Sequence, residues 1–234
     1  MTTSKPPSAA ATSVGRVREG NEDAYRTSDA AWVVADGLGG HAGGEVASEL
    51  AVQAAMAELS RPSSDPVAAL GAAYKAASDA VAARTLEQPE LADMATTMVA
   101  AMLVPGAGLY VGNVGDSRAY LLAGQLQQVT RDDNLAEELV ARGVLSPEEA
   151  RVHPGQYQLT RALGLGDWEP TVQHVPSPAG RLLLCSDGLN SEVPDAEIGR
   201  LLGSGSPQEA CDRLVSAALE AGGSDNITVV VVDL

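Results

Sequence analysis

Several residue types that would mark particular classes of protein are scarce in this sequence. Its 234 residues include no phenylalanine, two cysteines, two lysines and three histidines. Two cysteines cannot build the disulfide framework of a small secreted domain. Two lysines and a formal net charge of −16 argue against a broad basic face that would bind nucleic acid or an anionic membrane. We therefore expect no nucleic acid and no membrane among the partners.

Long apolar runs are missing as well. The sequence contains no stretch of about 18 apolar residues, the length that crosses a bilayer. Residues 1–12 are rich in Ser, Thr, Ala and Pro and lack the apolar segment of a signal peptide, so a disordered tail is expected there. These features favour a cytoplasmic protein, or a cytoplasmic domain of a longer one.

The rest of the chain, residues 13–234, is long enough for one domain with a sizeable core. Ala-rich segments with start and stop signals predict helices over 45–59, 67–86, 132–142, 147–151, 194–202 and 207–221. Runs rich in Val, Leu and Ala predict strands over 13–17, 32–35, 95–104, 109–114, 118–123, 125–130, 182–185 and 227–232. Turn residues join some neighbouring strands into hairpins. The expected strands and helices follow one another in groups, with hairpins between strands. This order predicts an α+β fold with mostly antiparallel sheet rather than alternating βαβ units.

Four acids lie where an expected core strand ends or begins. Asp36 ends the first apolar run, and Asp116 and Asp187 follow later strands. Asp225 comes just before the last strand. A single Asp-Gly pair is more often a structural turn. Because the pattern recurs, we expect these acids to converge on one edge of a sheet.

Clustered carboxylates repel one another and must either share protons or hold a cation. Their oxygen atoms select hard ions such as Mg²⁺ or Mn²⁺. Zinc is disfavoured because His41, His153 and His174 are scattered and the cysteines are unpaired. One carboxylate between two ions makes a two-metal site, which lowers the pKa of a bound water and binds a phosphoryl group.

Other kinds of site leave weaker signals. Gly37-Leu38-Gly39 followed by Ala42 matches a relaxed dinucleotide-binding fingerprint between a strand and a helix, but no βαβ unit follows. The sequence contains no Walker phosphate loop, no Cys-x5-Arg loop and no Gly-x-Ser-x-Gly elbow. Water is therefore the expected nucleophile.

Short motifs spread along the chain carry a resemblance to a known family. They lie at residues 15–18, 21–23, 34–41, 44–45, 96–97, 112–120, 159–164, 185–189 and 223–228. The chain resembles the type 2C, metal-dependent (PPM) serine/threonine protein phosphatases, most of all their compact bacterial branch. The resemblance runs from about residue 13 to the last residue. It implies two packed, mostly antiparallel β-sheets flanked by helices, an α-β-β-α sandwich.

The resemblance also implies a set of metal ligands. Asp36 matches the acid that bridges two metal ions, with the Gly37 carbonyl on one of them. Asp187 and Asp225 match ligands of the second ion. Asp116, with Asp187, matches a third-metal site of bacterial members; the alternative is a structural role in its loop. The implied cofactor is Mn²⁺ or Mg²⁺, as two or three ions.

The remaining site residues are also taken from the resemblance. Glu22 and Asp23 match outer-shell acids that hold metal-bound waters. Arg18 matches the arginine that holds the substrate phosphate, unless it only pairs with Glu22 at the surface. Some members have a histidine directly after the Asp-Gly pair; this chain has Leu38 there. His41 is a hypothetical general acid, or an ordinary loop histidine.

The implied function is hydrolysis of phosphoserine and phosphothreonine in proteins. A metal-bridging water attacks phosphorus in line, and no phosphoenzyme forms. Phosphoprotein substrates, an opposing bacterial serine/threonine kinase with its targets, and a monomeric state are expected. Two rivals stay open: a catalytically weak phosphoprotein-binding regulatory module of the same fold, and a hydrolase of small phosphoesters.

The sequence departs from the family where Asp132-Asp133-Asn134 replaces the usual Asp-His-Ser. This segment begins a flap, at about residues 133–157, which lies beside the active site in bacterial members. An acidic flap would favour basic phosphopeptides as substrates.

Overall fold

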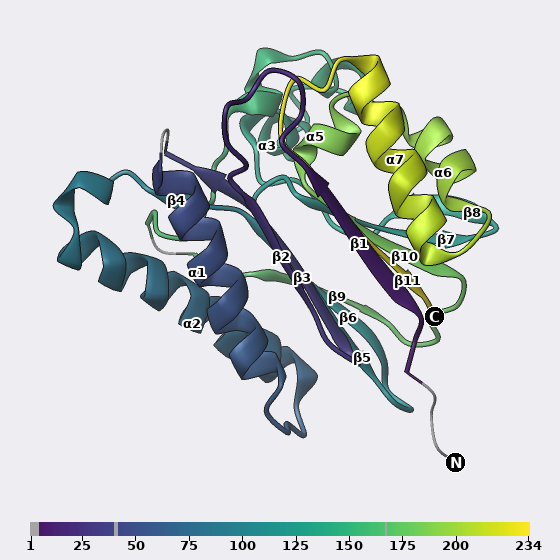
Figure 1. The fold of residues 1–234 in the computed structure, drawn as a ribbon, viewed down its shortest axis with the longest axis horizontal. Helices are drawn as coiled ribbons and strands as arrows, with labels where there is room; N and C mark the ends of the chain where they lie inside the picture. Colours follow the sequence, from purple (N-terminus) through teal and green to yellow (C-terminus); the bar gives the residue numbers. More distant parts are fainter. Residues whose placement is uncertain (1–4, 40–41, 167) are drawn as a thin grey trace.

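The computed structural model describes residues 5–39, 42–166 and 168–234. Its strands form two sheets that face each other (Figure 1). The first sheet has the order β1 (Ser8–Ser13), β11 (Ile227–Asp233), β10 (Arg181–Cys185), β7 (Arg118–Ala123) and β8 (Gln125–Gln128). The second sheet has the order β2 (Asp23–Thr27), β3 (Ala31–Leu38), β5 (Met98–Val104), β6 (Gly108–Val114) and β9 (Thr171–Val175), with the short β4 (Ala95–Thr96) beside β3. These strand pairs are antiparallel.

Helices cover the outer face of each sheet. α1 (Ala42–Leu59) and α2 (Pro66–Glu87) lie on the second sheet, and α6 (Asp195–Leu202) and α7 (Pro207–Ala221) lie on the first (Figure 1). The other helical segments are α3 (Leu135–Ala141), α4 (Pro147–Ala150), α5 (Asp187–Asn190) and the 3-10 turns Pro89–Leu91 and Pro154–Tyr157. The predicted α-β-β-α sandwich is confirmed.

The alternation of side chains along each central strand explains the apolar runs of the sequence. In β11, Val230 and Val232 lie in the core between the sheets, whereas Val229 and Val231 lie in the core beneath α6 and α7. All four side chains are completely buried. Because both faces of the strand are covered, the run is unbroken instead of alternating with polar residues.

The prediction of a disordered tail is wrong for residues 8–12. Ser8–Ser13 forms β1, which pairs along its whole length with β11. Ala9 and Ala11 pack on the core beneath α7, and Ala10 packs on the core between the sheets. The small residues of β1 do not predict a strand by themselves. They form one because they pair with the Val-rich β11, which would otherwise have a free edge.

Other differences concern strand boundaries. The opening strand predicted over 13–17 is not formed; the strand ends at Ser13. The predicted strand 95–104 is broken at Thr97 into β4 and β5. β2 and β9 were not predicted, because each carries charged or polar residues that dilute the strand pattern. The dinucleotide-binding alternative is overturned, since every strand that pairs with β3 among the described residues is antiparallel to it.

Candidate active site

Five of the predicted acids meet at one end of the two sheets. Asp36 near the end of β3 lies directly opposite Asp23, the first residue of β2. Asp187 follows β10, Asp225 precedes β11, and Asp116 follows β6. The charges of the other four all raise the pKa of Asp36, so these carboxyl groups lie within electrostatic reach of one another.

The backbone around Asp36 is fixed by two threonines at the break between β4 and β5. The Asp36 N–H donates to Thr97 Oγ1 at 3.0 Å. The Asp36 carbonyl accepts from the Thr97 N–H at 2.9 Å and from Thr96 Oγ1 at 2.8 Å. Thr97 Oγ1 also shares a hydrogen bond of 2.7 Å with Ser117 Oγ, next to Asp116. These bonds hold the loop of Asp116 against the end of β3.

Gly37 allows three segments to approach closely. A Cβ atom at this position would collide with the Gly44 carbonyl and lie 2.7 Å from the Glu22 carbonyl oxygen. A Cβ atom at Gly44 would lie 2.6 Å from Glu22 Oε2. The two glycines therefore bring β3, the start of α1 and the Glu22 side chain together, which no larger residue could do without moving the backbone.

Two polar residues tie Glu22 and Asp23 to the loops of Asp187 and Asp225. Ser186 Oγ donates to Asp23 Oδ2 at 2.7 Å and accepts from the Thr228 N–H at 2.9 Å. Asn226 Oδ1 accepts from the Glu22 N–H at 2.7 Å. Sequence reasoning assigned no role to Ser186 or Asn226, although each stands next to a predicted ligand.

Arg18 reaches the acid cluster from outside. Its guanidinium donates to Asp225 Oδ2 at 2.7 Å, and about half of the Arg18 side chain is exposed. Nearby Glu22 and Asp36 also raise the pKa of Arg18. The arginine therefore stands between the carboxylates and solvent, where an incoming anion would meet it.

Burial and mutual repulsion raise the pKa of the clustered acids. Burial raises the pKa of Asp23 to about 7, and burial with the charge of Asp187 raises the pKa of Asp116 to about 8. The pKa of Asp187 is raised by burial and by Asp225. The pKa of Asp36 is raised well above its ordinary value, chiefly by burial. At neutral pH the cluster must therefore keep protons or bind cations.

The donor set fits a hard divalent cation. Asp23 Oδ1 and Asp187 Oδ1 are buried without a hydrogen-bond partner, which is costly for a carboxylate unless a cation meets it. The converging atoms are all oxygen, the ligand type of Mg²⁺ and Mn²⁺. Within the described ranges, no three Asp, Glu, His or Cys side chains already converge as an ion site.

The two acids at the start of the predicted flap are buried and paired. Arg118 donates to both carboxylate oxygens of Asp132, at 2.9 and 2.7 Å. Asp133 accepts from the Gly115 N–H and pairs with Arg161. The charges of these two acids are compensated below the surface, so the pair adds little to an acidic flap surface. The preference for basic phosphopeptides stays a prediction.

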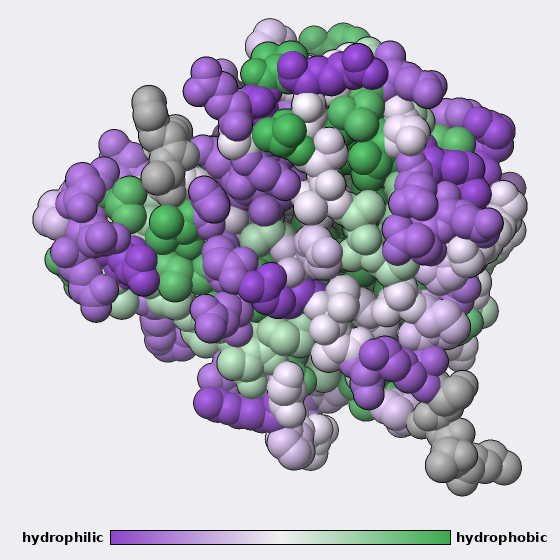
Figure 2. Space-filling model, viewed as in Figure 1, coloured by the Kyte–Doolittle hydropathy of each residue, from purple (hydrophilic) through white to green (hydrophobic). Residues whose placement is uncertain are grey.

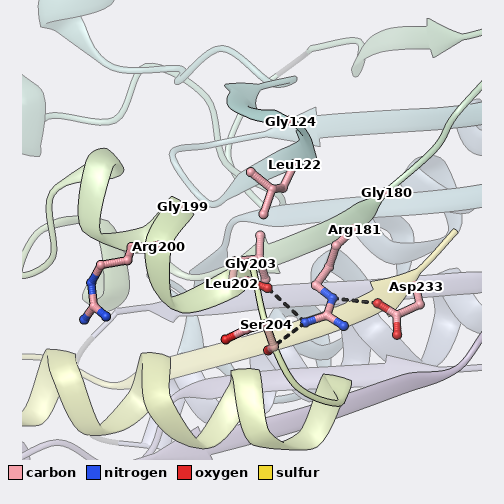
Figure 3. Close-up of a pocket in the computed structure, with 10 residues that line it drawn as sticks. All are labelled: Leu122, Gly124, Gly180, Arg181, Gly199, Arg200, Leu202, Gly203, Ser204 and Asp233. Atoms are coloured by element: carbon pink, nitrogen blue, oxygen red, sulfur yellow. Dashed lines mark hydrogen bonds and ion pairs between the residues drawn. The ribbon is translucent and has the colours of Figure 1, made fainter.

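A hollow of about 600 Å³ lies at the opposite end of the first sheet (Figure 3). Arg181 points into it and donates to Asp233 Oδ1 at 2.6 Å and to the Leu202 and Ser204 carbonyls. Arg200 extends away from these groups (Figure 3). It pairs with Glu197. The polar groups that line this hollow already form hydrogen bonds with one another, so their role at the end of α6 is structural.

The predicted site residues thus divide into two groups. The structure brings together Arg18, Glu22, Asp23, Asp36, Gly37, Asp116, Asp187 and Asp225. His41 lies outside the described residues. Thr97 and Asn113 support the backbone of the site: Thr97 Oγ1 accepts from the Asp36 N–H, and Asn113 Nδ2 donates to the Gly115 and Arg131 carbonyls at 3.0 and 3.1 Å.

Comparison with known proteins decides the family. The family described as Protein phosphatase 2C matches residues 12–220. The chain belongs to the protein phosphatase 2C family. It is 44% identical over 230 residues to the serine/threonine protein phosphatase PstP of Mycobacterium tuberculosis, covering 97% of this chain and 44% of that protein. This family member therefore spans less than half the length of that relative.

Two further comparisons extend over nearly the whole chain. The serine/threonine phosphatase stp of Listeria monocytogenes is 37% identical over 237 residues, covering 94% of this phosphatase 2C chain and 92% of that protein. The crystal structure of the PstP catalytic domain in complex with two manganese ions is 41% identical, with a TM-score of 0.88 and 97% of each chain covered. The fold and the family thus agree with those implied by the motifs.

Proposed function

We propose that this chain is a metal-dependent protein phosphatase that hydrolyses phosphoserine and phosphothreonine. The observation that carries the proposal is the buried cluster of acids with an arginine at its entrance. Family membership and the manganese complex of a relative support the same reaction. The exclusively oxygen donor set favours Mn²⁺ or Mg²⁺.

In this proposal Asp36 would hold two ions, one of them together with the Gly37 carbonyl. Asp187 and Asp225 would hold the second ion, and Asp116 with Asp187 would hold a third. When bound, the ions lower the pKa of water and offset the negative charge of the phosphoryl group. Their positive charge also explains how such buried carboxylates stay ionised at neutral pH.

The remaining proposed roles belong to groups around the acids. Arg18 binds the phosphate through its forked N–H donors, exchanging its bond to Asp225 for one to the substrate. Glu22 and Asp23 orient water at the edge of the cluster. His41 is a hypothesis for the general acid; unchanged turnover after His41→Gln would exclude it.

The wider context is proposed from the same family. The described elements act as one catalytic domain, and residues 133–157, which contain α3 and α4, form a flap beside the site. The substrates are phosphoproteins, including those of an opposing bacterial serine/threonine kinase, and the chain acts as a cytoplasmic monomer in signalling. Among the described residues, no helix is both long and apolar enough to cross a bilayer.

Release of phosphate from a phosphothreonine peptide tests the proposed function. Turnover should require Mn²⁺ or Mg²⁺, stop with EDTA, and fall more than about 100-fold in Asp187→Asn. Asp79→Asn is the matched control, because Asp79 is exposed on α2 and pairs only with Lys75 among the described residues. Wild-type protein that binds the phosphopeptide with Mn²⁺ but releases no phosphate would favour the regulatory module instead.

A further inference from the structure

One edge of β2 pairs with no strand of the described chain. β2 borders the second sheet, and its only strand neighbour is β3. The Ser28 N–H donates to the Ala31 carbonyl at 2.8 Å and continues the ladder between these strands. Since peptide groups alternate in direction along a strand, those of Asp23, Tyr25 and Thr27 face away from β3. The Asp23 N–H already donates to Asn21 Oδ1 at 3.2 Å, so this edge offers an incoming chain the N–H groups of Tyr25 and Thr27 and the outward carbonyls.

A hollow of about 380 Å³ lies along this edge. Thr12 of β1 and Glu49 of α1 line it together with all of β2, Asp23–Thr27. The neighbouring strand β1 carries only Ser, Ala and Thr, and the strip over it is white to light green in Figure 2. Small side chains leave room for a polypeptide beside the edge.

One end of the hollow is lined by a residue of the acid cluster. Asp23 lines the hollow and stands opposite Asp36 in the β2–β3 register. A chain lying along β2 would reach the candidate active site at this end.

We infer that the free edge of β2 binds the substrate polypeptide as an added antiparallel strand; this inference rests on the proposed phosphatase function. β2 runs away from the cluster, from Asp23 to Thr27. An antiparallel strand therefore runs toward the cluster and presents the phosphorylated residue at its end. Residues on the N-terminal side of the phosphorylated residue lie along β2. The antiparallel direction matches every strand pair that the structure describes and is the slightly more stable arrangement.

The chemistry of the hollow suits recognition of the main chain. Arg26 pairs with Glu49, so these two charges offset each other. Arg26 also donates to the Tyr25 carbonyl at 2.8 Å, and a substrate N–H replaces this bond when the strand adds. Strand addition obtains its affinity from backbone hydrogen bonds and tolerates many sequences. Such recognition fits an enzyme that acts on several phosphoproteins.

Peptides test the direction and the mode of binding. We compare a phosphothreonine with five residues on its N-terminal side and one with five residues on its C-terminal side. The first should have a kcat/KM about 10-fold higher, because a few net hydrogen bonds contribute about 1.4 kcal/mol. N-methylation of single peptide bonds in the first should lower kcat/KM at alternate positions only. Equal kcat/KM values, or no alternation, would overturn the inference.

A variant of the enzyme tests the same edge. Thr27→Pro removes an outward N–H without removing a bond to β3, and exposed edge positions tolerate proline. Thr27→Pro should lower kcat/KM about fivefold for the peptide with five residues on the N-terminal side of its phosphothreonine, but not for para-nitrophenyl phosphate. The control Thr27→Ala keeps the N–H and should lower kcat/KM for neither substrate. Equal losses on both substrates would contradict the inference. If wild-type protein with Mn²⁺ hydrolyses neither substrate, the proposed function itself fails.

Discussion

Asp133 and Gly115 exchange two hydrogen bonds across the candidate site. The Gly115 N–H donates to Asp133 Oδ2 at 3.0 Å, and the Asp133 N–H donates to the Gly115 carbonyl at 2.9 Å. Asp133 also pairs with Arg161, and the Thr160 N–H donates to the Asp133 carbonyl at 2.8 Å. Asp133 thus joins the start of the flap to Gly115, the residue before Asp116. From the sequence, Asp133 was only a departure from the family pattern.

Asp133→Ala should lower the free energy of unfolding by about 3 kcal/mol. The change leaves the buried Gly115 N–H without its side-chain acceptor. It also removes the acidic partner of Arg161, and breaking such a pair is costly. Denaturant unfolding measures the loss. Glu148→Ala, at an exposed position of α4, is the control and should cost less than about 0.5 kcal/mol. A loss below about 1 kcal/mol for Asp133→Ala would contradict the anchoring role.

Gly37→Ala and Gly71→Ala should have opposite effects on stability. The new methyl group at Gly37 collides with backbone atoms of Gly44, so we expect a loss of about 3 kcal/mol or failure to fold. At Gly71, inside α2, the methyl group meets no atom within 4 Å. Alanine there should stabilise the helix by about 0.5–1 kcal/mol. Thermal unfolding of both variants checks the contrast, and similar midpoints for the two would disprove it.

Without divalent metal, stability should fall as the pH rises from about 4 to 8. The pKa values of Asp23 and Asp116 are raised by burial to about 7 and about 8. In this window the folded state keeps protons that the unfolded state has released, so folding stability decreases with pH. Chemical unfolding in EDTA at pH 5 and pH 8 measures the slope.

Saturating Mn²⁺ should flatten or reverse that slope, because the cation favours the ionised carboxylates. The matching control is Asp116→Asn in EDTA, which removes one titrating group and should weaken the pH dependence. A metal-free protein that is more stable at pH 8 than at pH 5 would contradict the prediction.

Arg118→Lys should cost about 2 kcal/mol of stability. Arg118 binds both oxygens of Asp132 and donates to Tyr120 Oη at 2.8 Å, and Tyr120 in turn donates to Asp195 Oδ1 at 3.1 Å. Lysine cannot reproduce this planar set of donors. Unfolding measurements should show a much smaller effect for Arg200→Lys, since the Arg200–Glu197 pair is exposed. Equal losses of stability for the two variants would contradict a stabilising role for this hydrogen-bond network.

Many strands of the sandwich could be predicted from apolar runs in the sequence. β11 and β10 are buried on both faces, and this produces continuous Val and Leu segments that a sequence reveals. β1 and β2 could not be read in this way. Their residues are small or charged, and they become strands only because a neighbouring strand supplies the hydrogen bonds.

The candidate site, too, was only partly predictable from the sequence. Acids at strand ends, such as Asp36 and Asp187, have a position in the pattern that predicts convergence. The residues that hold them do not: Ser186 and Asn226 act through bonds to segments more than 160 residues away in sequence. Such long-range partners depend on tertiary structure and leave no local signal in a single sequence.

The pairing of β1 with β11 joins the first strand of the chain to the last. Synthesis from the N-terminus leaves Ser8–Ser13 without its partner until Ile227–Asp233 has emerged, so the first sheet closes late and by a long-range step. The Asp233 N–H donates to the Pro7 carbonyl at 2.9 Å, which places Pro7 and Asp233 side by side. A short linker across them, with a new opening at the exposed turn near Gly106, should yield a circular permutant that folds with the first sheet formed early.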